Sequence, residues 1–577
     1  MRTTMRTKGI AIVAVCAAII SGLLVTTTPA GAEDFSKPFK GFAPPNTVLE
    51  DASPASVGLD PGPIADAVEA IHGYEQPQAN GHPMYAGAVG IMGHDGKIVE
   101  RDASGYALRY ATDTTELPRD QWVPMRDDTL FDLASVSKLF TSIAAVQLIE
   151  EGKVQLEAPV ATYLPEFAAN GKEAVTVRQL LTHTSGFVAW LPLWSQYPDK
   201  ASRIQAVMEQ PLDNPPGTHY LYSDLNLITL GVLVERVTGK SLDQVVADRI
   251  TGPLGMTDTG YNPTDKTRTA ATEYQVSPPR GMVWGEVHDE NAWSLGGVAG
   301  HAGVFSTVDD MAILSQALLN GGTYKGHRIL SRKSVQSLIT NYNTDFPGDD
   351  HGLGFELNQR WYMDALSGPR TAGHTGYTGT SIVIDFASHS FAILLTNRVH
   401  PSRNWGSNNP SRRDWARGLA LAMGVRPQHG DTAWFSGAQD AATHTLTTPE
   451  LAVPTSGANL AFDLFLDTEE TDLLTLERST DGGTTWSPQP FETRDRGETS
   501  ATDGVVSGSG DRRWVQARAE LSSGNQQLRW RYTTDPSYLG RGVYVDDIVV
   551  RARGGALLDG EKSPDALSSN GWTLRSR

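Results

Sequence analysis

The spacing of apolar residues in the first two thirds of the chain predicts helices mixed with antiparallel strands. In residues 59–71 apolar positions recur at helical intervals. Two short apolar runs, 86–92 and 97–100, flank a turn sequence and predict a β-hairpin. The runs 381–384 and 391–395 predict a second antiparallel pair. This mixture indicates an α+β fold, an antiparallel sheet flanked by helices.

Beyond residue 427 the pattern changes to short strand-like runs without helical periodicity. The candidate strands are Ala461–Leu466, Leu473–Arg478, Trp514–Ala519, Gln527–Tyr532 and Val543–Val550. Stretches rich in Gly, Ser and Asp lie between them and predict turns. The region is therefore predicted to be an all-β sandwich.

A chain of 577 residues is too long for one hydrophobic core. We predict five segments along it. They are a signal peptide (1–32), a lead-in segment (33–58), a first folded domain (59–427), a linker (428–432) and a β-sandwich accessory domain (433–577).

The first 32 residues have the build of a secretory signal peptide. Three cations precede the apolar run 9–25, and the stretch ends in Ala30-Gly31-Ala32. We expect cleavage after Ala32 and a secreted, extracellular protein, with retention as an uncleaved anchor as the alternative. No later segment is apolar over the length that spans a membrane.

Composition narrows the possible partners. The formal net charge is −18 and no cluster of Lys and Arg is present, which argues against nucleic acid or an anionic membrane surface. The single cysteine, Cys16, lies in the predicted signal peptide. We therefore expect a mature protein without a thiol nucleophile, a disulfide or a thiolate metal site.

Candidate chemistry begins with Ser135 and Lys138, the only Ser-x-x-Lys step in the sequence. If a helix starts at Ser135 and continues through Ile149, residues three apart share one face, so the hydroxyl and the amine lie together. The helix N-terminus would also favour developing negative charge. The alternative is a solvated turn, which the apolar flanking residues disfavour.

Two further motifs follow in order, Tyr222-Ser223-Asp224 and His374-Thr375-Gly376. Together with Ser135-Val136-Ser137-Lys138 they resemble the three motifs of the serine β-lactamase and penicillin-recognising enzyme family. The resemblance is closest to the branch of class C β-lactamases, DD-peptidases and related esterases, and it covers roughly residues 59–425. The phrase Leu180-Leu181-Thr182-His183-Thr184-Ser185-Gly186 is also typical of that branch.

The resemblance implies a helical subdomain added to the sheet, and it implies a role for each motif. Ser135 is the expected nucleophile, and Lys138 is its base if partial desolvation lowers the lysine pKa. Tyr222 shares the proton network, and the backbone N–H groups of Ser135 and Tyr377 form the oxyanion hole. The expected catalytic residues are Ser135, Lys138, Tyr222 and His374, and the expected substrate-binding residues are Asp224, Thr375, Gly376 and Tyr377.

Two positions depart from the family pattern. Asp224 stands where an asparagine usually contacts the acyl-side amide of the substrate, and a carboxylate lacks that donor. His374 stands where a lysine is common. Because an imidazole can lose its charge near neutrality, we expect activity to fall as pH rises through the pKa of His374.

Four residues are of types that commonly bind metal ions: His288, Asp289, Glu290 and His301. Contiguous residues do not converge on an ion unless their loop folds back. We therefore favour a loop that borders the site and expect no metal. The glycine-rich stretch 296–303 lacks the context of a nucleotide-binding loop and is interpreted as a tight turn nearby.

The C-terminal part resembles the MAM-type jelly-roll modules of secreted bacterial proteases. The resemblance rests on three sequence segments: Asp431–Gly437, Thr480–Trp486 and Tyr544–Ile548. Four tryptophans could form a sugar-stacking surface, although a core role is favoured: Trp434, Trp486, Trp514 and Trp530. Five acidic residues could bind Ca²⁺ or simply form solvated turns: Glu469, Glu470, Asp472, Asp546 and Asp547.

We expect a secreted serine hydrolase that forms an acyl-enzyme at Ser135 and needs no cofactor. Small esters and D-alanyl peptides are the leading substrates, and β-lactams come third. The accessory domain could hold the enzyme near cell wall or another polymer. The alternative is a wall-binding or penicillin-binding protein that binds its ligand without hydrolysing it.

Overall fold

The computed structural model of the protein describes residues 41–509 and 512–576. The predicted signal peptide and most of the lead-in segment lie outside these residues. Within them, no helix combines the length and apolar character needed to cross a membrane.

The first part of the chain is built on one large sheet. In spatial order its strands are β1 (Glu50–Asp51), β3 (Lys97–Leu108), β2 (Gly87–His94), β15 (Ser390–Thr396), β14 (Ser381–Asp385), β13 (Thr371–Thr375) and β12 (Glu356–Leu357), with β4 (Val123–Pro124) on β3. All pairs except β1 with β3 are antiparallel, and both predicted strand pairs are confirmed. Because β2 pairs with β15, segments about 300 residues apart in sequence meet in the middle of the sheet.

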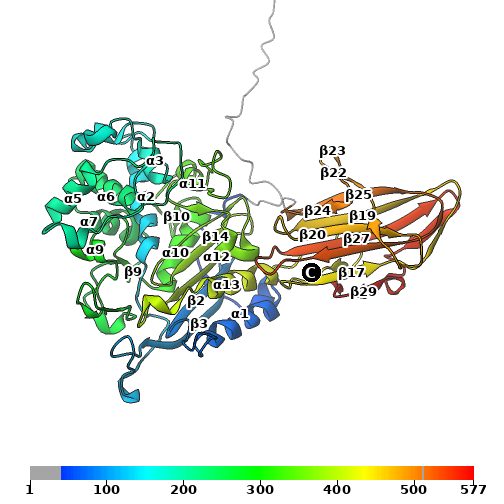
Figure 1. Cartoon of the computed structure of the whole chain (residues 1–577), viewed down its shortest axis with the longest axis horizontal. Coiled ribbons are helices and arrows are strands. Elements are labelled where there is room, and N and C mark those ends of the chain that lie inside the picture. The colour runs from blue at the N-terminus through cyan, green and yellow to red at the C-terminus, as the bar shows by residue number, and fades with distance from the viewer. Residues whose placement is uncertain (1–40, 510–511, 577) are drawn as a thin grey trace, which may run out of the picture. The chain divides into compact units, whose positions relative to one another are not determined.

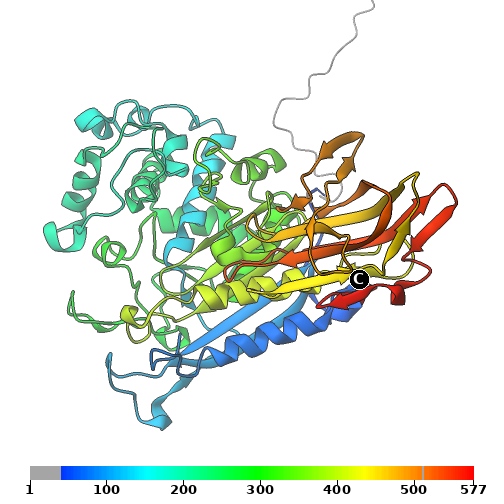
Figure 2. The ribbon, with the colours of Figure 1, turned by 45° about the vertical axis from the view of Figure 1, so that its right-hand side comes forward.

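Helices cover both faces of this sheet (Figures 1 and 2). Helices α1 (Pro61–Gly73) and α13 (Asn409–Ala422) lie side by side on one face, and α10 (Val308–Leu319) packs on the other. The side chains of β2 alternate accordingly. Val89 and Ile91 belong to the core on the α10 side, whereas Ala88 and Met92 belong to the core beneath α1 and α13. The α+β prediction is therefore confirmed.

A helical subdomain surrounds helix α2 (Ser137–Glu150), which is buried on almost every side. A helix that is apolar on nearly every face belongs in a core, and the sequence after Lys138 is mostly apolar. The neighbouring helices are α3 (Val177–Leu181), α4 (Leu193–Gln196), α5 (Lys200–Glu209), α6 (Asp224–Thr238), α7 (Leu242–Val246), α8 (Gly252–Leu254) and α9 (Glu290–Ser294). The remaining helices of this part are α11 (Arg332–Leu338) and α12 (Arg360–Met363).

The C-terminal part has its own core between two sheets. One sheet orders β23 (Glu498–Ala501), β22 (Glu492–Asp495), β25 (Trp514–Leu521), β19 (Ala458–Asp467), β27 (Gly542–Ala552), β16 (Ala433–Phe435) and β30 (Thr573–Arg575), with β28 (Gly555–Asp559) on β27. The other orders β21 (Ser487–Pro488), β20 (Leu473–Ser479), β26 (Gly524–Thr533), β17 (Thr443–Thr447) and β29 (Ser568–Asn570), with β18 (Leu451–Val453) on β26 and β24 (Val505–Val506) on β20. All five predicted strands are present, so the β-sandwich is confirmed.

The tryptophans of the sandwich differ in burial. Trp530 is fully buried and contacts Phe462 edge-to-face, as the core interpretation predicts. Trp434, Trp486 and Trp514 are half-buried. The linker at 428–432 and the other segment boundaries stay predictions.

The packing of β2 against α13 gives a stability prediction. A Cβ atom at Gly90 would lie 2.4 Å from the ring of Trp415, which is almost fully buried and cannot move aside. Gly90→Ala should therefore lower the free energy of unfolding by about 1–3 kcal/mol, the usual cost of overpacking a core.

The matched control is Gly73→Ala at the end of α1, where an added Cβ meets no atom within 4 Å. Urea unfolding followed by circular dichroism should show a lower midpoint for Gly90→Ala only. Equal midpoints in the two variants would show that Trp415 does not fill this space.

Candidate active site

Ser135 lies in a single 3-10 turn, Ala134–Val136, directly ahead of α2. The sequence predicts Ser135 as the first residue of the α-helix itself, and this detail is wrong because the helix begins at Ser137. Ala134 has a φ of 47°, a left-handed conformation that is costly for a residue with a side chain. The carboxylate of Asp132 accepts a hydrogen bond from the Ala134 N–H at 2.9 Å and holds this turn in place.

Lys138 is fully buried and its Nζ has three oxygen partners. It donates to the Ser135 Oγ at 2.9 Å and to the His301 carbonyl at 3.2 Å, and it forms an ion pair with the Asp224 Oδ1 at 2.8 Å. An ammonium group has three N–H donors and no lone pair. The three acceptors therefore match the charged form of the lysine.

The electrostatics of Lys138 differ from the expectation. Burial alone would lower its pKa, but the Asp224 carboxylate and Tyr222 outweigh burial and raise the pKa above its usual value. The prediction that desolvation lowers this pKa is therefore wrong. The reason is Asp224, which places a negative charge against the amine.

Tyr222 lies on the other side of Ser135. Its hydroxyl is within hydrogen-bonding reach of Ser135 and Lys138, and burial raises its pKa to about 12 although the Lys138 charge opposes this. Its ring lies 4.6 Å from that of His183, centroid to centroid. The next residue, Ser223, caps α6 by accepting from the Leu225 N–H, so α6 starts at Asp224.

His183 is a site neighbour whose role the sequence did not reveal. Its Nδ1 accepts from the Ser223 N–H at 3.0 Å and lies 3.1 Å from the Asn226 amide nitrogen. Burial keeps its pKa well below the usual value, so the ring is neutral. His183 therefore fixes the backbone between Tyr222 and α6.

His374 is also buried and neutral. Its Nδ1 lies 2.7 Å from the Thr375 carbonyl oxygen, which assigns the N–H to Nδ1. Burial, helped by the Lys138 charge, lowers its pKa to about 3. The expectation that His374 titrates near neutrality is therefore wrong, because the imidazole is already uncharged well below pH 7.

The loop 376–380 is clamped beside the Ser135 turn. A Cβ at Gly376 would lie 2.4 Å from the Leu133 carbonyl oxygen, so only glycine permits this approach. The Thr380 hydroxyl donates to the same oxygen at 3.0 Å. From α13, the buried Arg412 Nη2 donates to the Gly376 carbonyl at 2.7 Å, and the Asn408 side chain donates to the Gly379 carbonyl at 2.9 Å.

This clamp holds Tyr377, the predicted second oxyanion donor, in a fixed loop. The sequence contained no signal for Asn408 and Arg412, because both act on backbone oxygens and belong to no recognised motif.

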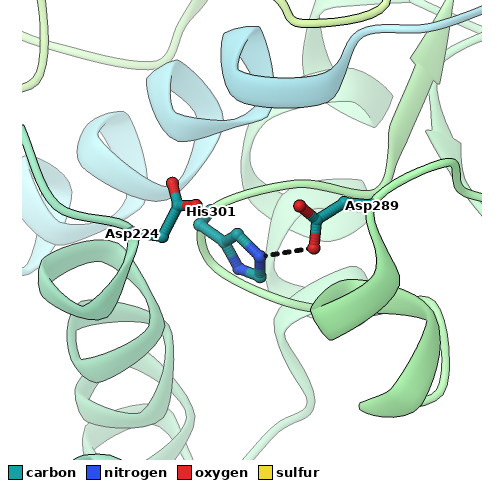
Figure 3. A group of neighbouring side chains, drawn as sticks. All are labelled: Asp224, Asp289 and His301. Carbon is teal, nitrogen blue, oxygen red and sulfur yellow. Dashed lines mark hydrogen bonds and ion pairs between the residues drawn. The ribbon is translucent and has the colours of Figure 1, made fainter. Parts of the chain in front are cut away.

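The run His288-Asp289-Glu290 separates into three sets of contacts. His288 Nε2 lies 2.9 Å from Glu273, and Glu290 pairs with Arg403. Asp289 faces His301 at 2.9 Å, as Figure 3 shows. Burial alone would raise the pKa of Asp289, but His301 lowers it well below its usual value.

Asp224, Asp289 and His301 each offer a ligand atom within 4.8 Å of the others (Figure 3). Two of the three were weighed as metal ligands in the sequence, whereas Asp224 was not. The cation beside Asp224 is already the Lys138 ammonium, and Asp289 is paired with His301. Both carboxylates therefore already have a partner within the protein, and the absence of a metal stays a prediction.

The acidic residues of the sandwich do not form a single set of contacts. Glu469 and Asp472 lie together with Asp535, and burial raises the pKa values of Glu469 and Asp472 to about 7 and 6. Asp546 instead accepts from the backbone N–H groups of Gln428 and His429 at 2.7 and 2.8 Å. Calcium binding here stays a prediction.

Comparison with known proteins gives two family matches. Residues 78–417 match the model described as Beta-lactamase, and residues 419–576 match the model described as Immune inhibitor A-like, MAM domain. A relative from Escherichia coli (strain K12), named a D-alanyl-D-alanine carboxypeptidase, is 36% identical over 354 residues, covering 55% of this chain and 79% of the relative. One of the same name from Salmonella typhi is 34% identical over 400 residues, 62% of this chain and 88% of the relative.

Among solved structures, the chain is similar to a penicillin-binding protein homolog from Caulobacter crescentus. The identity is 22% and the TM-score 0.49, with 63% of this chain and 99% of that chain covered.

The ion pair between Lys138 and Asp224 leads to a prediction on pH dependence. Asp224→Asn removes the negative charge that raises the lysine pKa, so Lys138 should lose its proton at lower pH. If the neutral amine is the active form, the alkaline rise of the acylation rate should move toward neutrality. Stopped-flow acylation by an activated ester between pH 6 and 10 measures this, with Asp248→Asn, a surface partner of Lys240, as the control.

A second prediction concerns metal ions. Because Asp224 already contacts the Lys138 ammonium and Asp289 already contacts His301, dialysis of the protein against a chelator should leave ester or penicillin turnover unchanged. Loss of activity on chelation with recovery on adding Zn²⁺ would instead identify this group as a metal centre.

Proposed function

The chain belongs to the beta-lactamase family and is a serine hydrolase, and from this premise we propose that it cleaves ester or D-alanyl amide bonds through an acyl-enzyme on Ser135. The observation that carries the proposal is the buried Lys138 Nζ, 2.9 Å from the Ser135 Oγ and within reach of Tyr222. A serine hydroxyl needs a proton acceptor to attack a carbonyl at neutral pH, and Lys138 with Tyr222 can supply one after the pair has lost a proton.

The reaction depends on the protonation state of Lys138 and Tyr222. In the resting state the pair holds an ammonium and a phenol, so the active form is the one that has lost one proton. The Ser135 Oγ then bonds to the substrate carbonyl carbon while its proton passes to the pair. The N–H groups of Ser135 and Tyr377 stabilise the oxyanion, a contribution of about 3 kcal/mol for one donor.

As the intermediate collapses, the bond to the leaving group breaks and Tyr222 returns the proton to the leaving oxygen or nitrogen. Water then attacks the acyl-Ser135 ester, and the same pair takes its proton. The product acid departs and the Ser135 hydroxyl is restored. Each proton taken by the pair is given back, so the cycle balances.

The substrate class follows from Asp224 and from the relatives. The relatives named D-alanyl-D-alanine carboxypeptidases favour a D-alanyl amide. Asp224 favours an ester, because its carboxylate has no N–H for an acyl-side amide and is engaged by Lys138. β-Lactams rank third, and a penicillin-binding protein without turnover is the alternative.

We also propose that residues 1–32 direct secretion and are removed. The C-terminal module, which matches the MAM domain model, would then hold the enzyme near cell wall or another polymer.

The test uses the intact protein with a fluorescent penicillin and with a short-chain p-nitrophenyl ester. Wild type should become labelled by the penicillin and should release p-nitrophenol from the ester. Ser135→Ala should show neither, with an unchanged melting temperature. Turnover that survives the substitution, or no reaction of wild type with either reagent, would overturn the assignment.

A further inference from the structure

A small apolar cavity lies in the helical subdomain, next to the glycine-rich stretch 296–303. Its volume is about 110 Å³, and it is lined by residues of α5, α6, α7 and the segment 295–300. Helices α5 and α7 both pack against α6 in this subdomain (Figure 1). Six branched aliphatic side chains line the cavity: Ile204, Ile228, Val232, Leu242, Leu295 and Val298.

The charged groups of this cavity are two, and they are of opposite sign. Lys200 is exposed and Glu235 is half-buried, whereas every other lining residue is apolar. The Glu235 Oε1 already accepts from the Leu242 N–H at 3.0 Å. A ligand of either charge would therefore meet one like charge, and apolar walls offer too few polar partners to hold water. The cavity suits an uncharged apolar group.

The size and the access of the cavity also fit a small molecule. An apolar cavity of about 150 Å³ engineered into another protein binds benzene or xenon, and this one approaches that size. Ile204, Val232 and Val298 are only half-buried, so the wall of the cavity reaches the protein surface. A ligand can therefore enter without unfolding of the subdomain.

One wall of the cavity leads directly to the catalytic lysine. Gly300 lines the cavity, and the carbonyl of the next residue, His301, accepts from the Lys138 Nζ at 3.2 Å. The Gly300 carbonyl accepts from the Thr141 hydroxyl of α2 at 2.8 Å. Gly300 also packs on α6, where a Cβ added at Gly231 would lie 3.0 Å from the Gly300 Cα. The position of this wall is therefore tied to the position of a Lys138 acceptor.

We propose that this cavity, which we call the loop pocket, binds a small uncharged alkyl or aryl group and that its occupancy slows the reaction at Ser135 through the segment 298–301. An occupied pocket supports that segment from the side that is otherwise empty, which keeps the His301 carbonyl on the Lys138 ammonium. This hydrogen bond favours the charged lysine, whereas the reaction needs the pair of Lys138 and Tyr222 to lose a proton. The effect on the rate rests on the proposed acyl-enzyme, and the binding does not.

The probe is benzene, added to the full chain. Its binding should raise the melting temperature of wild type in a saturable way, by roughly 2 °C at ten times its Kd. The kcat for p-nitrophenyl acetate should fall by roughly fivefold, the lower end of the usual range of coupling between sites. The KM should stay unchanged, because the loop pocket is separate from the substrate site.

Val232→Phe fills the loop pocket from α6 and should imitate the bound state. Its kcat should already be low, and benzene should change neither its kcat nor its melting temperature. The matched control is Val237→Phe, because Val237 is half-buried on the same helix and does not line the pocket. Val237→Phe should respond to benzene as wild type does. Ile204→Phe, which fills the pocket from α5, replaces Val232→Phe if that variant does not fold.

A wild-type melting temperature that benzene leaves unchanged, or an equal rise in Val232→Phe, would overturn the loop pocket. Binding without a fall in kcat, or a rise in KM alone, would overturn its action on the reaction. Absence of Ser135-dependent turnover by wild type would overturn the proposed function, and the melting temperatures would still decide whether the pocket binds benzene.

Discussion

The candidate site depends on how one buried ammonium group is neutralised. Lys138 lies in a helix that is buried on almost every side, and an unpaired charge there would cost several kcal/mol. Its acceptors come from three elements, the Ser135 turn, the first residue of α6 and the loop that carries His301. These elements must therefore meet at Lys138, and their meeting brings the nucleophile, the carboxylate and the loop together.

Close backbone approaches hold the same elements in place. Gly300 touches α6, where an added Cβ would lie 1.9 Å from the Leu227 carbonyl oxygen, and the Thr141 hydroxyl donates to the Gly300 carbonyl. Gly376 makes a comparable approach to Leu133 on the opposite side. The glycine-rich stretch 296–303 thus packs closely against α6 and α2 next to the site, in agreement with its interpretation as a tight turn.

Asp224 links the chemistry to the substrate question. A carboxylate at this position stabilises the charged lysine and has no N–H to donate to a substrate. Both effects come from one side chain. The first favours an alkaline active form of the Lys138 and Tyr222 pair, and the second is the reason for ranking esters among the proposed substrates.

The sequence alone was sufficient for the fold class, the two strand pairs and the sandwich strands, because the spacing of apolar residues is a local property of the chain. It also singled out Ser135, Lys138, Tyr222 and His374 through local motifs, and their catalytic roles stay predictions. It placed the start of the α-helix two residues early, at Ser135, because it did not reveal the left-handed Ala134 and the 3-10 turn that precede Ser137. It also misjudged the pKa values of Lys138 and His374. Those values depend on burial and on charges brought close only by folding. The clamp from Arg412 on the Gly376 carbonyl depends in the same way on segments that only the tertiary structure brings together.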